Sequence, residues 1–75
     1  MFRLDVHLKD IEAIKRFVNI TNRYPFHIAL RQDRALIDAK SLMGVLSLDL
    51  NRVLTVHYNE ADTEFGLLLD RFAVE

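Results

Sequence analysis

Hydrophobic and polar residues alternate along several short segments of the chain, beginning with residues 2–8. In that segment every second residue is apolar, and charged residues or histidine stand between them. A period of two is typical of a β-strand that has one face on a core and one face toward water. Three later segments also read as strands, and a polar turn joins the middle pair as a hairpin. The predicted strands are residues 2–8, 26–31, 35–39 and 53–58.

Three other segments repeat their apolar residues at the spacing of a helix. In the first of them Asp10 is a good N-cap, and Glu12 in the first turn suits the helix dipole. Pro25 ends this helix, because the residue before a proline resists the α region. Ser41 opens a short helix rich in leucine, and acidic residues open the last helix. The predicted helices are residues 10–23, 41–50 and 59–72.

The predicted order of elements is βαββαβα. Strands with one polar face and helices with one apolar face predict an α+β fold of two layers, with the helices covering one side of an antiparallel sheet. The 75 residues are enough for a single domain, 1–75, and no linker or repeat divides them. The chain is 51% hydrophobic, which supplies the core that such a small domain must draw from nearly every element.

Charge and composition narrow the class of protein. Lysine and arginine number 10 against 11 aspartates and glutamates, whereas a duplex nucleic-acid binder usually has a basic surplus. The absence of cysteine excludes a disulfide framework and a thiolate zinc site. No apolar run approaches the roughly 18 residues of a membrane span, and the alternating N-terminus is unlike a signal peptide. We therefore expect a cytoplasmic protein without a cofactor, which binds neither nucleic acid nor a membrane.

The segment "DAKSLMGVLSLDL", residues 38–50, carries a resemblance to a known family. It resembles the "KSIMG(V/L)MSL" segment of HPr, the small phosphocarrier of the bacterial sugar phosphotransferase system. It is more similar still to the HPr-like catabolite-repression regulator, whose segment also begins with Ala-Lys-Ser. "NRYPFHIAL", residues 22–30, is similar to the end of the first helix and the second strand of that family. The resemblance implies an open-faced β-sandwich with a four-stranded antiparallel sheet of order 1-4-2-3.

The residue that defines the family's chemistry is replaced in this chain. In the family a histidine near the first helix, in a segment like "GIHARPA", takes a phosphoryl group from Enzyme I and passes it to sugar-specific transporter components. The matching segment here is "LKDIEAI". It puts Asp10 at the phosphohistidine position, Glu12 at the position of the assisting arginine and Ala13 at that of the proline. Two carboxylates would repel an incoming phosphate, so we expect an HPr-like protein without phosphocarrier activity.

Ser41 matches the family's regulatory serine, which a dedicated kinase phosphorylates in some bacteria. A phosphate there would meet free N–H groups at a helix N-terminus, whereas the unmodified serine would simply cap the helix.

The apolar residues that follow Ser41 are too many for one buried stripe of a helix, so some should be exposed. By position, Leu42, Met43 and Leu46 would contact a protein partner. Burial of the whole helix or a homodimer contact is the alternative.

Three histidines, His7, His27 and His57, take outward positions in the predicted strands. If those strands are neighbours, the imidazoles could line up across the open face and bind a transition metal or sense pH. A solvated or partner-covered face is the simpler interpretation, because the sequence does not give the strand register.

These observations favour a regulatory or protein-interaction module related to the phosphotransferase system. The helix at residues 41–50 would contact a phosphotransferase-system or transcription-regulatory protein. An independent enzyme is not expected, because the sequence shows no nucleophile–base pair, P-loop or thiolate cluster. One alternative is a working phosphocarrier that uses Asp10 or another acceptor. Another is an ACT-type ligand-sensing domain, which a sheet order other than 1-4-2-3 would favour.

Overall fold

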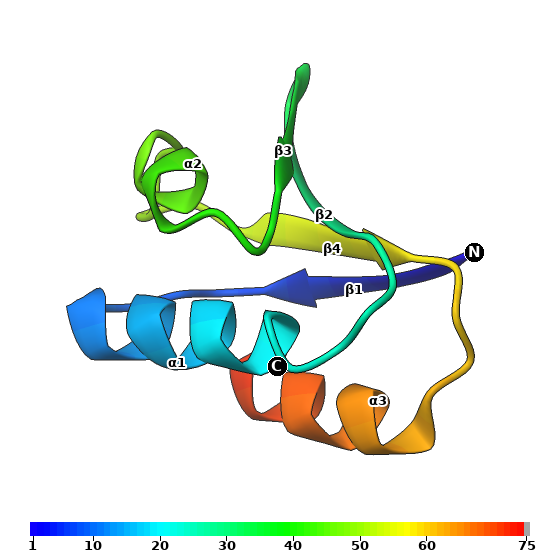
Figure 1. Ribbon diagram of the computed structural model, residues 1–75. Coiled ribbons are helices and arrows are strands. Elements are labelled where there is room, and N and C mark those ends of the chain that lie inside the picture. Colours follow the sequence, from blue (N-terminus) through cyan, green and yellow to red (C-terminus); the bar gives the residue numbers. More distant parts are fainter. Residues whose placement is uncertain (75) are drawn as a thin grey trace.

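The structure is a computed structural model that describes residues 1–74, and its elements follow the predicted order βαββαβα (Figure 1). The elements are β1 (Phe2–Val6), α1 (Ile11–Thr21), β2 (Ile28–Gln32), β3 (Ala35–Asp38), α2 (Leu42–Leu46), β4 (Leu54–Tyr58), α3 (Thr63–Leu69) and the 3₁₀ turn η1 (Asp70–Phe72). None of the helices within the described residues is long and apolar enough to cross a membrane.

The four strands form one antiparallel sheet of order β1-β4-β2-β3, which confirms the predicted order 1-4-2-3. The central strand β4 pairs with β1 on one side, where Arg3 lies opposite His57, and with β2 on the other, where Ala29 lies opposite His57. β3 is an edge strand held by its hairpin with β2. In Figure 1, α1 and α3 lie together below β1, and α2 lies next to β3.

The predicted alternation between core and open face is confirmed in β4, whereas in β2 Ala29, expected to point outward, is buried like its neighbours Ile28 and Leu30. In β4, Leu54 and Val56 are fully buried, whereas Thr55 and His57 between them keep part of their surface exposed. Buried residues of the helices pack against the buried face of the sheet and complete the core. The buried core consists of Val6, Leu8, Ile14, Phe17, Val18, Ile20, Tyr24, Ile28, Leu30, Ala39, Val45, Leu54, Val56, Phe65 and Leu69.

The second helix is shorter than the predicted residues 41–50, because α2 ends at Leu46. Ser47 Oγ donates to the carbonyl oxygen of Gly44 at 2.6 Å, a local bond that competes with helix continuation. Farther along, Gln32 binds both backbone groups of Asp49: Nε2 donates to its carbonyl oxygen at 2.8 Å, and Oε1 accepts from its N–H at 2.9 Å. These bonds hold the following segment as a loop.

The last helix also begins later than predicted. The Asp62 carboxylate accepts a hydrogen bond from the backbone N–H of Phe65 at 2.9 Å and caps α3, so residues 59–61 belong to the preceding loop. The helix then continues into the short turn η1, which ends at Phe72. The prediction that acidic residues begin this helix is therefore confirmed, but the helix begins at Thr63, after the cap Asp62, and not at residue 59.

Candidate functional site

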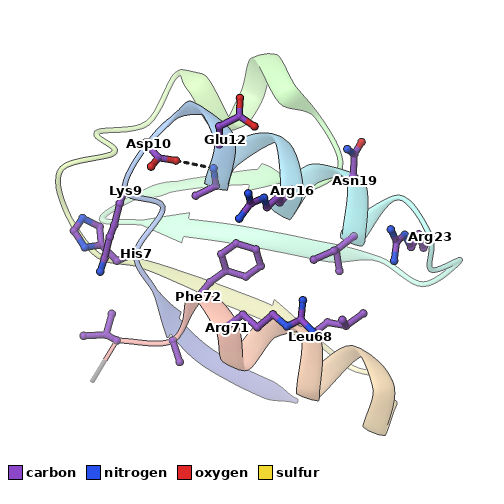
Figure 2. A pocket seen from close by; sticks show the side chains of 14 residues that line it. His7, Lys9, Asp10, Glu12, Arg16, Asn19, Arg23, Leu68, Arg71 and Phe72 are labelled. Atoms are coloured by element: carbon purple, nitrogen blue, oxygen red, sulfur yellow. Dashed lines mark hydrogen bonds between the residues drawn. The ribbon is translucent and has the colours of Figure 1, made fainter.

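Asp10 caps α1 as the sequence predicts, and its carboxylate is already engaged. The residue has an extended backbone, and its Oδ1 accepts a hydrogen bond from the N–H of Ala13 at 2.8 Å (Figure 2). Its carbonyl oxygen accepts from the N–H of Ile14 at 3.1 Å. Such a cap satisfies one of the free donors at the start of a helix. Asp10 therefore has a complete structural role without covalent modification.

The charges around the first turn of α1 are mixed. Asp10 and Glu12 are both exposed, and they bring two negative charges to the start of α1. A third negative charge would be repelled there. Lys9 and Arg16 line a surface hollow together with these acids, yet neither forms an ion pair within residues 1–74. This arrangement suits a helix cap better than a phosphoryl acceptor.

Ser41 is the N-cap of α2, which confirms its structural prediction. Its Oγ accepts a hydrogen bond from the N–H of Gly44 at 3.1 Å, and the residue is partly buried. Gly44 leaves the space that this cap needs, because a Cβ at position 44 would lie only 3.2 Å from the Ser41 Oγ. A phosphate on Ser41 would bring further acceptor oxygens to this N–H.

Three side-chain hydrogen bonds fix the segment before Ser41 to the C-terminal end of α1. They run from Thr21 Oγ1 to the Ala39 carbonyl (3.1 Å), from Asn22 Nδ2 to the Lys40 carbonyl (3.0 Å) and from Lys40 Nζ to the Tyr24 carbonyl (2.6 Å). Because these contacts join segments far apart in the sequence, the start of α2 has a defined place beside α1.

The helix α2 buries only one of its apolar side chains completely. Val45 has no exposed surface, whereas the exposed fractions are 41% for Leu42, 84% for Met43 and 44% for Leu46. The two leucines in the loop after α2 pack against the core instead. The predicted exposure of Leu42, Met43 and Leu46 is therefore confirmed, and their contact with a partner stays a prediction.

The three histidines do not form the row that their strand positions suggested. Only His57 lies within a strand, and His7 and His27 lie just outside β1 and β2. The register pairs His57 with Arg3, so His7 lies four residues farther along, beyond the end of β1. Within residues 1–74 no group of three histidine, cysteine or acidic side chains could hold a metal ion. The structure therefore gives no support to the three-histidine metal site.

His57 has an unusual environment on the open face of the sheet. Its Nε2 is buried without a hydrogen-bond partner in the described part of the chain, and its Nδ1 lies 3.5 Å from the Met1 Sδ. Burial lowers the pKa of His57, the positive charges of Arg3 and Arg31 lower it further, and Asp5 opposes them. The surroundings of the ring therefore favour its neutral form.

Sequence reasoning missed a hollow of about 890 Å³ on the side of α1 that faces the C-terminal segment. Figure 2 shows the side chains that line it, with Asp10 at one end. Its four cations, which define the basic groove, are Lys9, Arg16, Arg23 and Arg71. Arg16 lies on α1, whereas Lys9 precedes the N-cap of this helix and Arg23 follows its C-cap, so the spacing of seven residues between them is not a helical repeat. Arg71 is distant in sequence, and no local pattern connects it to the others.

Comparison with known proteins places the fold. No family model matches the sequence, and no curated protein matches it. Among solved structures, the chain is similar to HPr-C-His from Thermoanaerobacter tengcongensis, with a TM-score of 0.78, 20% identity, and coverage of 95% of this chain and 89% of that chain. It is also similar to the phosphocarrier protein HPr from Bacillus anthracis str. Ames, with a TM-score of 0.67 and 28% identity. This similarity covers 96% of this chain and 89% of that chain.

These two similarities extend over nearly the whole chain, so the fold is that of HPr proteins. The resemblance carried by residues 38–50 is thereby confirmed, together with the expected α+β architecture.

Proposed function

We propose that this chain is an HPr-like protein without phosphocarrier activity, which acts in regulation related to the phosphotransferase system by contacting other proteins. The similarity to two HPr structures supports the relation to that system. The loss of carrier chemistry is supported above all by the hydrogen bond between Ala13 and Asp10. A helix cap stands where the family has its phosphohistidine.

The chemistry of Asp10 differs from that of the family's histidine in two ways. A phosphocarrier histidine attacks with a neutral imidazole nitrogen, whereas a carboxylate brings its own negative charge to the phosphoryl donor. Phosphorylation of the Asp10 oxygen bonded to Ala13 would also remove the cap of α1. The nearby Glu12 adds a second negative charge and leaves the first turn without the family's arginine.

The proposed partner surface is the α2 face, which consists of Leu42, Met43 and Leu46. An exposed apolar cluster of this kind is typical of a protein contact, and an unbranched methionine adapts to different partner surfaces. The bonds from α1 hold this face in place, which lowers the ordering cost of binding. Phosphorylation of Ser41 would add negative charge at the edge of the α2 face and would regulate the contact.

Isothermal titration calorimetry tests the α2 face with purified Enzyme I and with transcription regulators that bind HPr. We expect Met43→Ser to weaken binding by about tenfold or more, because truncation of a central interface side chain costs over about 1 kcal/mol. Leu67→Ser is the matched control, since Leu67 is 64% exposed and lies on α3. Equal effects of the two substitutions, or binding by neither class of protein, would contradict the proposal.

Sedimentation velocity of the chain alone would detect a homodimer that forms through the α2 face.

Two alternative functions, an ACT-type domain and a working carrier, can be compared with this proposal. The ACT-type ligand-sensing domain required a sheet order other than 1-4-2-3, and the observed order counts against it. A working carrier with another acceptor differs from our proposal in a measurable way, since it would take a phosphoryl group from Enzyme I. An enzymatic activity is not proposed, because HPr proteins are carriers rather than enzymes.

A further inference from the structure

The basic groove lies on a different side of α1 from the α2 face. Arg16 lies within α1 and Arg23 follows just beyond the C-cap Asn22, and both line the groove. Asn22, which binds the loop before α2, is turned by about 120° from Arg16 around the helix axis. Arg71 faces the two arginines from the C-terminal turn (Figure 2). A ligand in the groove would therefore leave the α2 face free.

The cations of the groove have no charged or hydrogen-bonding side-chain partner among residues 1–74. Within residues 1–74 the only ion pair joins Arg52 and Asp33, in a different part of the fold. The side chains of Lys9, Arg16, Arg23 and Arg71 also make no hydrogen bond to described residues. Against these four positive charges the described part of the chain brings two acids to the groove, Asp10 and Glu12. An anionic ligand would relieve this local repulsion.

Hydrogen bonds hold the walls of the groove in place. The Tyr24 hydroxyl donates to Glu64 Oε1 at 2.6 Å, which ties the end of α1 to α3. This bond raises the pKa of Tyr24 to about 12, so it persists throughout the physiological range. At the other end, the His7 N–H donates to the Phe72 carbonyl oxygen at 2.9 Å. A groove with fixed walls binds its ligand with less loss of conformational freedom.

The shape and spacing of the groove indicate what it would bind. Its floor is apolar, formed by Ile20, Leu68 and Phe72. From Arg16 to the C-cap Asn22 the helical backbone rises about 9 Å, and Arg23 follows directly. An extended peptide in the polyproline II conformation has three residues per turn and rises about 3.1 Å per residue, so its side chains three residues apart lie on the same side, about 9 Å apart. Such a peptide with an acidic residue at every third position would thus place one carboxylate near each arginine.

We propose that the basic groove binds an extended acidic segment of a partner protein. Its carboxylates would accept paired hydrogen bonds from the guanidinium groups, the geometry that arginine favours. Apolar side chains between them would cover the floor at Ile20 and Phe72. A single small anion would engage only one or two of the four cations. This inference does not depend on the role proposed for the α2 face.

Fluorescence anisotropy tests the groove with a labelled peptide of roughly nine residues, which has glutamate at every third position and valine or serine between. We expect saturable binding that weakens as salt is raised. Arg16→Gln combined with Arg23→Gln should weaken it by about tenfold or more. The matched control combines Lys15→Gln with Arg34→Gln. It removes the same charge from exposed positions outside the groove and should change affinity by less than about twofold.

Several results would overturn the proposal. Equal losses in the two double variants would indicate unspecific attraction, and absence of saturable binding would exclude the peptide. A peptide of the same composition with its glutamates consecutive should bind several-fold more weakly, and equal binding would contradict the spacing argument. Tighter binding of a single-stranded DNA oligonucleotide would assign the groove to nucleic acid instead. Self-association that the groove double variant abolishes would assign it to a second copy. Circular dichroism confirms that each variant is folded.

Discussion

Substitution of Val45 by alanine tests the orientation of α2, on which the proposed partner surface depends. Val45 is the only fully buried residue of this helix. Alanine removes two methyl groups worth about 0.8 kcal/mol each on transfer from water, and incomplete collapse of the cavity adds to the loss. We therefore expect the free energy of unfolding to fall by about 2 kcal/mol. For a domain of this size the melting temperature should fall by roughly 10 °C.

Met43→Ala is the matched control for this experiment. Met43 is 84% exposed, so its truncation should change the free energy of unfolding by less than about 0.5 kcal/mol. Urea unfolding followed by circular dichroism measures both variants under the same conditions. A loss for Met43→Ala as large as that for Val45→Ala would mean that α2 packs through its other side. That result would refute both the orientation and the α2 face.

Substitutions at three further positions probe separate contacts. Asp10→Ala should lower the free energy of unfolding by about 1 kcal/mol through loss of the cap, and Asp10→Ser should restore most of it in thermal melts. Gln32→Ala should cost about 1–3 kcal/mol in urea unfolding and speed amide exchange at Asp49, because both of its bonds are lost. Folding lowers the pKa of His57, so protonation favours the unfolded chain and wild-type stability falls as pH drops below 6.5. His57→Gln should flatten that decline in pH-dependent melts, and an unchanged slope would contradict this cause.

Much of the fold could be predicted because its signals are local. The alternation in β4 gives the buried pair Leu54 and Val56 directly. The caps of α1 and α2 could be predicted because a short polar side chain bonds an N–H only three residues away, as in Asp10 and Ser41. The sheet order came from the family resemblance rather than from periodicity, and the structure confirms it.

The features that the sequence did not reveal depend on contacts between distant residues. α2 ends early partly because Gln32 holds Asp49 in a loop, and nothing near Asp49 in the sequence indicates this. The predicted row of histidines is not formed. The strand register pairs His57 with Arg3, so His7 lies four residues farther along, beyond the end of β1. The basic groove needs Arg71 from the other end of the chain, so only the folded structure completes it.

Phosphoryl transfer tests the central claim most directly. The purified chain is incubated with Enzyme I and labelled phosphoenolpyruvate, and HPr in a parallel reaction serves as the positive control. We predict no label on this chain, because the Asp10 carboxylate caps α1 at the position that the resemblance matches to the family's phosphohistidine. Stoichiometric label on the chain would contradict the account, and its mapping to Asp10 or to a histidine would identify the acceptor of a working carrier.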